Sequence, residues 1–167
     1  MRKLRYKCCT DIYIRLLSKN MNLYLLGHMG LGLLSVYMLN KISKVNYSVP
    51  LVCLCSILPD IDIFIPFLPH RGPTHSVILP LILLPMVLIR FRKGLPYLVS
   101  FLSHSLIGDL ITSYGGSSKG MYLWPLSNSW IDLGITWDMQ STSESFFEYA
   151  LFGLMIFLII YHNYQEN

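Results

Sequence analysis

Acidic and histidine side chains occur inside or beside the apolar segments of this chain, where charged groups are costly. A carboxylate at bilayer depth costs roughly 2.5 to 3.5 kcal/mol if it has no partner. Aspartate and histidine together are ligands that divalent cations use, and a bound cation would remove this cost. The pattern therefore predicts a metal site in a membrane protein, with seven candidate ligands: His28, Asp60, Asp62, His70, His75, His104 and Asp109.

Three short motifs hold six of these side chains: Pro-Asp-Ile-Asp at 59–62, His-Arg-Gly-Pro-Thr-His-Ser at 70–76 and His-Ser-Leu-Ile-Gly-Asp at 104–109. In a regular helix, Asp60 and Asp62 would point about 200° apart and could not share one ion. Because Pro59 and Pro66 bracket them, we expect the helix to end or unwind there. Side-chain alternation in an unwound segment would put both carboxylates on one side.

The third motif raises a similar question of direction. His104 and Asp109 are five residues apart, which corresponds to about 140° around a regular helix. We expect both to reach one ion only if Gly108 loosens the turn. Thr74 and Ser76, beside the second motif, are expected to cap the following helix or to hydrogen-bond the ligands.

The elements that must position these groups are apolar segments. With 53% hydrophobic and 13% charged residues in 167, the chain has the composition of one small membrane domain. We predict an all-α fold, a polytopic transmembrane bundle of about four or five spans with proline-broken helices. The predicted spans are approximately 23–39, 49–68, 76–89, 95–111 and 146–161. Glycines and tryptophans in 114–145 predict an interfacial loop or a lid over the polar site.

The residue types indicate which chemistry such a site would perform. A mixed His/Asp ligand set suits Zn²⁺, with Mn²⁺ or Fe²⁺ as alternatives, and seven ligands are enough for one or two ions. Such ions activate water for attack on a phosphoester, with a carboxylate such as Asp62 as general base. Arg71 would bind a substrate phosphate through two parallel hydrogen bonds. A lipid or lipid-linked phosphate would suit a site at the membrane surface.

In order and type, the early His28 and the three motifs resemble those of the YdjM-like membrane-bound metal-dependent hydrolases. The resemblance covers roughly residues 21–125, and its most specific part is the His-Arg-Gly-Pro-Thr-His-Ser sequence at 70–76. It implies a multi-pass integral membrane protein with metal-dependent hydrolase activity. Members of that family typically begin just before the early histidine, which favours Met21 as the translation start.

Charge near the segment ends predicts the orientation in the cell membrane. Basic residues within 41–44 and 90–93 indicate that this face is cytoplasmic, which leaves the predicted metal site facing outward. Basic residues within 1–20 favour the opposite orientation. Translation from Met21 would resolve the conflict, and otherwise 1–20 is a basic surface segment before a single membrane domain at 21–167. Membrane lipids are the expected partners, and no aromatic-basic pattern indicates nucleic-acid binding.

Two other functions fit the same residues. Intramembrane aspartates and histidines also form ion pathways, so an ion- or proton-coupled carrier is one alternative. A non-catalytic membrane protein, in which an Asp/His/Arg network fixes helix packing, is the other. The carrier would move a substrate without hydrolysing any ester, and the structural network would hold no metal.

Overall fold

The computed structural model describes residues 21–109, 112–113, 119–132, 137–138 and 142–166. The predictions for residues 1–20 lie outside these ranges. The described helices are α2 (Met21–Ser43), α3 (Val49–Ile57), α4 (Ile78–Ile89), α5 (Leu95–Ser103) and α7 (Thr142–Glu166). The one pair of described strands, β1 (Thr112–Ser113) and β2 (Trp137–Asp138), is two residues long and parallel. The predicted all-α fold is therefore confirmed.

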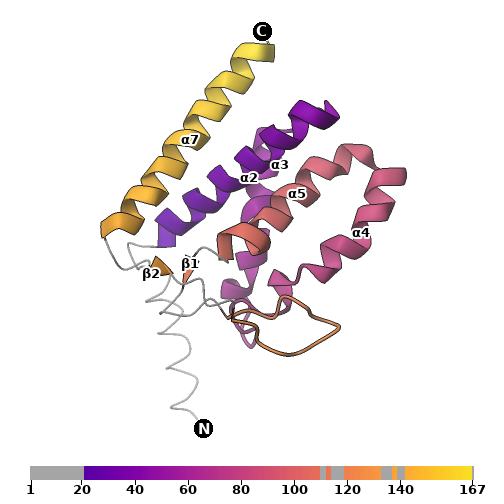
Figure 1. Ribbon diagram of the computed structural model, residues 1–167, viewed down its shortest axis with the longest axis vertical. Coiled ribbons are helices and arrows are strands. Elements are labelled where there is room, and N and C mark those ends of the chain that lie inside the picture. Colours follow the sequence, from indigo (N-terminus) through magenta and orange to yellow (C-terminus); the bar gives the residue numbers. More distant parts are fainter. Residues whose placement is uncertain (1–20, 110–111, 114–118, 133–136, 139–141, 167) are drawn as a thin grey trace.

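The long helix α2 lies at the centre of the molecule and packs against α3, α5 and α7 (Figure 1). The apolar core forms along these contacts, from Leu33, Val36, Val52, Met155 and Leu158. Gly32 on α2 allows the close approach, because a Cβ there would collide with Ser56 on α3 and Ser100 on α5. No helix among the described residues has both the length and the apolar content needed to cross a membrane.

The second apolar segment breaks where its prolines and aspartates predicted. The α-helix α3 ends at Ile57, and Leu58–Phe64 continue as a 3₁₀ helix, η1. The expectation of an extended segment with both carboxylates on one side was wrong. A 3₁₀ helix has about three residues per turn, so Asp60 and Asp62 diverge and contact different atoms of the site.

The fourth apolar segment changes its winding as well. After α5 ends at Ser103, residues His104–Gly108 form a π-helical turn, and the Asp109 N–H donates to the His104 carbonyl. This hydrogen bond spans five residues instead of four, so the turn is wider than an α-helical one. The predicted loosening near Gly108 is therefore present, and it aligns Asp109 with His104.

The described part of the glycine- and tryptophan-rich loop, 119–132, lies against the segment that carries the second motif (Figure 1, orange loop). Its ends are joined by a bridge between Gly120 and Ile131. The Met121 N–H donates to the Arg71 carbonyl at 2.9 Å, and the Val77 N–H donates to the Tyr122 carbonyl at 3.0 Å. These bonds fix the loop on the polar site.

Candidate metal centre

The structure brings all seven predicted ligands into one network at one end of the helix bundle. Six of them form two groups whose ligand atoms lie within 4.8 Å of one another. The first group comes from α2 and the π-helical turn: His28, His104 and Asp109. The second comes from η1 and the segment after it: Asp60, His70 and His75. Asp62 belongs to neither group.

His75 joins the two groups. Its side chain is fully buried, and its Nε2 atom lies 3.3 Å from Asp60 Oδ1, 3.3 Å from His104 Nε2 and 3.7 Å from Asp109 Oδ2. Its other nitrogen, Nδ1, lies 3.3 Å from Asp62 Oδ2. One imidazole therefore contacts three carboxylates and a second imidazole.

These neighbours determine the protonation of His75. Burial lowers the pKa of the imidazole, but hydrogen bonds to Asp60 and Asp62 and the charge of Asp109 outweigh that effect and raise it to about 9. Without a cation, His75 is therefore positively charged at neutral pH and compensates the surrounding carboxylates. A divalent cation would take over that compensation, since a ligating imidazole is neutral.

Asp62 holds the second motif in place. Its Oδ2 atom accepts hydrogen bonds from the Arg71 backbone N–H at 3.1 Å and from Thr74 Oγ1 at 2.9 Å. Its Oδ1 atom lies 3.1 Å from His70 Nδ1. Through these contacts, Asp62 orients His70 and His75 and closes the turn between them. The backbone of Arg71 in this turn has a φ of 59°, a left-handed conformation that residues other than glycine rarely adopt.

The rings of His28 and His104, two members of the first group, pack face to face. Their rings stack with centroids 3.8 Å apart and an interplanar angle of 21°. His104 Nδ1 lies 2.6 Å from the Ser56 carbonyl oxygen, which accepts a hydrogen bond from the Nδ1–H group. This bond orients the ring so that Nε2 is directed at His75. Gly108 makes room for this arrangement, because a Cβ at that position would overlap the His28 ring.

Two buried ligand atoms favour a bound cation. Among the described residues, His28 Nδ1 and Asp109 Oδ2 are buried and have no hydrogen-bond partner. A buried polar atom without a hydrogen bond costs about 1–3 kcal/mol. Both atoms belong to the first ligand group, and a divalent cation would satisfy them. The residues present therefore fit a metal ion.

Arg71 balances charge at the same place. Its side chain is 7% exposed, and its Nε atom lies 3.4 Å from Asp109 Oδ1. The predicted contact with a substrate phosphate is not tested by this arrangement, since the guanidinium lies beside a carboxylate. What the structure shows is a buried cation within reach of the first ligand group.

The hydroxyls of the second motif act as the sequence predicted. Thr74 donates to Asp62, and Ser76 Oγ accepts the Ile78 N–H at the start of α4 at 3.1 Å. Ser76 also donates to the Trp124 carbonyl of the loop. Sequence reasoning did not find Ser56, whose carbonyl orients His104. It lies in an apolar helix, and its contribution comes from the backbone, so its residue type carries no signal.

Comparison with protein families matches the chain to a family described as YdjM inner membrane protein, over residues 23–166. The match covers most of the chain, so this protein belongs to the YdjM family of inner membrane proteins and resides in the cell membrane. The resemblance noted from its motifs is thereby confirmed. Neither the curated proteins nor the solved structures contain a match to this chain.

Proposed function

We propose that this protein is a metal-dependent hydrolase of the inner membrane, acting on phosphoesters of lipids or lipid-linked molecules. The observation that carries the proposal is the pair of adjacent His/Asp ligand groups, each with ligand atoms within 4.8 Å of one another. Zn²⁺ is the expected ion, with Mn²⁺ or Fe²⁺ as alternatives. A divalent cation held by these residues would polarise a phosphoryl oxygen and would lower the pKa of a bound water.

The residues of the chain would supply orientation and charge. His28, His104 and Asp109 would hold one ion, and Asp60, His70 and His75 would hold the same ion or a second one. Asp62 would orient two of these histidines, which in metal sites is the task of a carboxylate behind the ligands. The Arg71 guanidinium, which lies beside Asp109, would balance the negative charge of a substrate phosphate bound at the first ligand group.

Exposure indicates where a substrate would enter. The side chains of His70 and Asp60 are 21% and 18% exposed, whereas those of Asp62, His75 and His104 are 0% exposed. The opening of the site is therefore at Asp60 and His70. Exposed apolar side chains of the same region, among them Ile61, Phe64 and Phe67, would place this opening at the membrane surface.

In this proposal, two membrane segments each consist of an α-helix followed directly by a second type of helical turn. The helix α3 continues directly into η1, and α5 continues into the π-helical turn. We propose that such composite segments, together with α2, α4 and α7, form a multi-pass membrane domain. Large apolar side chains along α4, among them Leu81, Ile82, Leu83 and Ile89, are exposed in the isolated chain, as lipid-facing residues would be.

Elemental analysis of the detergent-purified protein, tagged without histidines, tests the proposal. The parent should contain stoichiometric metal, and His75→Ala and Asp60→Asn should lose it. A metal-bearing parent justifies a screen of phosphoesters, in which Asp62→Ala should abolish metal-dependent hydrolysis while leaving membrane insertion intact. A parent that is folded but free of metal would contradict the proposal and favour the structural network, in which His75 and Arg71 compensate the carboxylates.

A further inference from the structure

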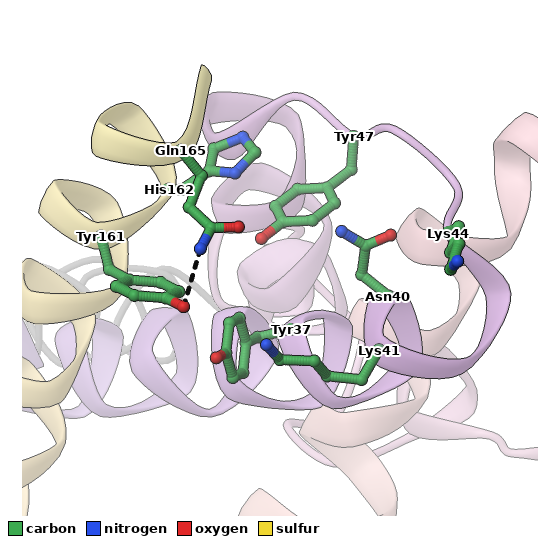
Figure 2. A pocket seen from close by; sticks show the side chains of 8 residues that line it. All are labelled: Tyr37, Asn40, Lys41, Lys44, Tyr47, Tyr161, His162 and Gln165. Atoms are coloured by element: carbon green, nitrogen blue, oxygen red, sulfur yellow. Dashed lines mark hydrogen bonds between the residues drawn. The ribbon is translucent and has the colours of Figure 1, made fainter. Parts of the chain in front are cut away.

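A polar cavity lies away from the candidate metal centre, between the C-terminal ends of α2 and α7 (Figure 2). Its volume is about 200 Å³. The residues that line it are polar or aromatic: Tyr37, Asn40, Lys41, Lys44, Tyr47, Tyr161, His162 and Gln165. None of the seven candidate metal ligands takes part, so the cavity needs an explanation of its own.

The aromatic side chains give the cavity a fixed wall. The rings of Tyr47 and His162 stack with centroids 4.7 Å apart and an interplanar angle of 11°. Gln165 Nε2 donates to the Tyr161 hydroxyl at 2.8 Å, the dashed line in Figure 2. The Tyr47–His162 stack joins the loop after α2 to α7, and the hydrogen bond lies within α7, so the lining is built from segments far apart in the sequence.

The charge of the cavity is positive. Lys41 and Lys44 contribute two ammonium groups, and none of the lining side chains is acidic. Lys41 Nζ lies 4.9 Å from the centroid of the Tyr37 ring and 5.9 Å from that of Tyr161, so the amine is held over the aromatic wall. Two lysines that line a polar cavity attract an anion, and a phosphate group matches them in charge.

The backbone of Lys44 is unusual for its residue type. Its φ is 49°, in the left-handed region, and its N–H donates to the Asn40 carbonyl at 3.0 Å as α2 ends. Glycine is the residue that usually occupies this position after a helix. The chain instead places a lysine there, at the edge of the cavity.

Asn40 adds a requirement for a hydrogen-bond donor. Its Oδ1 atom is buried and has no hydrogen-bond partner among the described residues. A ligand hydroxyl would donate to this oxygen while the lysines bind an anionic group. The cavity therefore matches a phosphate ester of a small polyol in charge and hydrogen bonding.

We infer that this cavity binds the phosphate group of a glycerol phosphate ester, the chemistry of an anionic phospholipid headgroup. Basic cavities between membrane helices on the cytoplasmic side are known sites for such headgroups. Apolar side chains next to it on α2, Met38 at 59% and Ile42 at 87% exposure, would contact the acyl chains of a lipid. The same phosphate chemistry occurs in soluble glycerol 3-phosphate, and the test separates the two sources.

The test counts lipid bound to the full-length protein. The purified protein is equilibrated with equal amounts of phosphatidylglycerol and phosphatidylcholine in mild detergent, and native mass spectrometry counts each bound lipid. We expect the parent to retain phosphatidylglycerol in preference. Lys41→Gln and Lys44→Gly should each reduce that preference about fivefold, the effect of one basic residue near an anionic surface.

Lys44→Gly is the variant that separates binding from folding. Glycine suits the left-handed backbone, so the fold should be kept while the charge is removed. Lys93→Gln is the matched control, because Lys93 is an exposed lysine that does not line the cavity. An unchanged preference in both cavity variants, or an equal loss in Lys93→Gln, would overturn the inference.

A competition experiment identifies the source of the phosphate group. Glycerol 3-phosphate and inorganic phosphate are added to the complex in increasing amounts. Retention of the lipid at millimolar concentrations of both assigns the cavity to the headgroup of a membrane lipid. Displacement by glycerol 3-phosphate, with the same dependence on Lys41, assigns it to the soluble ester. A parent that binds neither ligand would refute the inference.

Discussion

His28 and His104 stack ring on ring, with their centroids 3.8 Å apart, although 75 residues separate them in the chain. The stack joins α2 to the π-helical turn that follows α5. It is possible because Gly108 has no side chain: a Cβ there would overlap the His28 ring. The first ligand group therefore depends on a glycine that is not itself a ligand.

The first prediction concerns this glycine. Gly108→Ala should lower the free energy of unfolding by about 1–3 kcal/mol, because the added methyl group must displace a packed ring. Thermal unfolding of the purified protein measures the change. Gly153→Ala is the matched control, since a Cβ at that exposed position on α7 meets no atom within 4 Å. Equal melting temperatures for the parent and Gly108→Ala would contradict the prediction.

The second prediction separates a ligand from the carboxylate behind it. Asp62 contacts His70, His75 and Thr74, but it belongs to neither ligand group. Asp62→Asn should therefore weaken metal binding about 10- to 100-fold while leaving the site able to load at high metal concentration.

Asp60→Asn supplies the comparison, because Asp60 belongs to the second ligand group. This variant should lose more affinity than Asp62→Asn. Equilibrium dialysis against Zn²⁺ with elemental analysis measures both. If the two variants lose affinity equally, the distinction drawn from the geometry is wrong.

The third prediction concerns removal of the metal. Chelation should lower the melting temperature of the parent, and added Zn²⁺ should restore it. At a free metal concentration of 100 times Kd, the stabilisation is about 2.7 kcal/mol. His75→Ala should respond to neither treatment, since His75 contacts both ligand groups. A parent whose melting temperature is unchanged by chelator and by added metal would contradict the prediction.

The fourth prediction concerns orientation. Asn128 and Lys93 are exposed, the first in the loop on the metal-site end and the second in the turn between α4 and α5. With all native cysteines replaced by serine, Asn128→Cys in intact cells should react with an impermeant maleimide, whereas Lys93→Cys should react after lysis. The reverse pattern would place the site at the cytoplasmic face.

Sequence patterns predicted the break at Asp60 but not its geometry. Proline positions show that an α-helix cannot continue, yet they do not distinguish an extended chain from a 3₁₀ helix, because φ near −65° serves both. The choice was set by the contacts of the two carboxylates, which require His75 from a distant motif. Long-range contacts of this kind are not encoded in local spacing.

The ligand set itself was visible in the sequence because aspartate and histidine are rare in apolar segments, so each of them is informative. The cavity with Lys41 and Asn40 was not visible in the same way. Lysines at a segment end were interpreted as a signal of orientation, and an asparagine there carries no signal. Their role depends on α7, which folds back along α2 from more than a hundred residues away.

The π-helical turn at His104–Gly108 also makes the site sensitive to chain length. Such a turn holds one residue more than an α-helical turn. Wound as an ordinary α-helix, the same five-residue step would turn Asp109 about 140° away from His104. Inserting a residue between them would therefore misplace the carboxylate. Deleting Leu106 or Ile107, two exposed residues outside the ligand groups, would leave a four-residue α-helical step with both side chains on one face. The candidate metal centre thus depends on the wider winding of this turn as much as on the chemical identity of its residues.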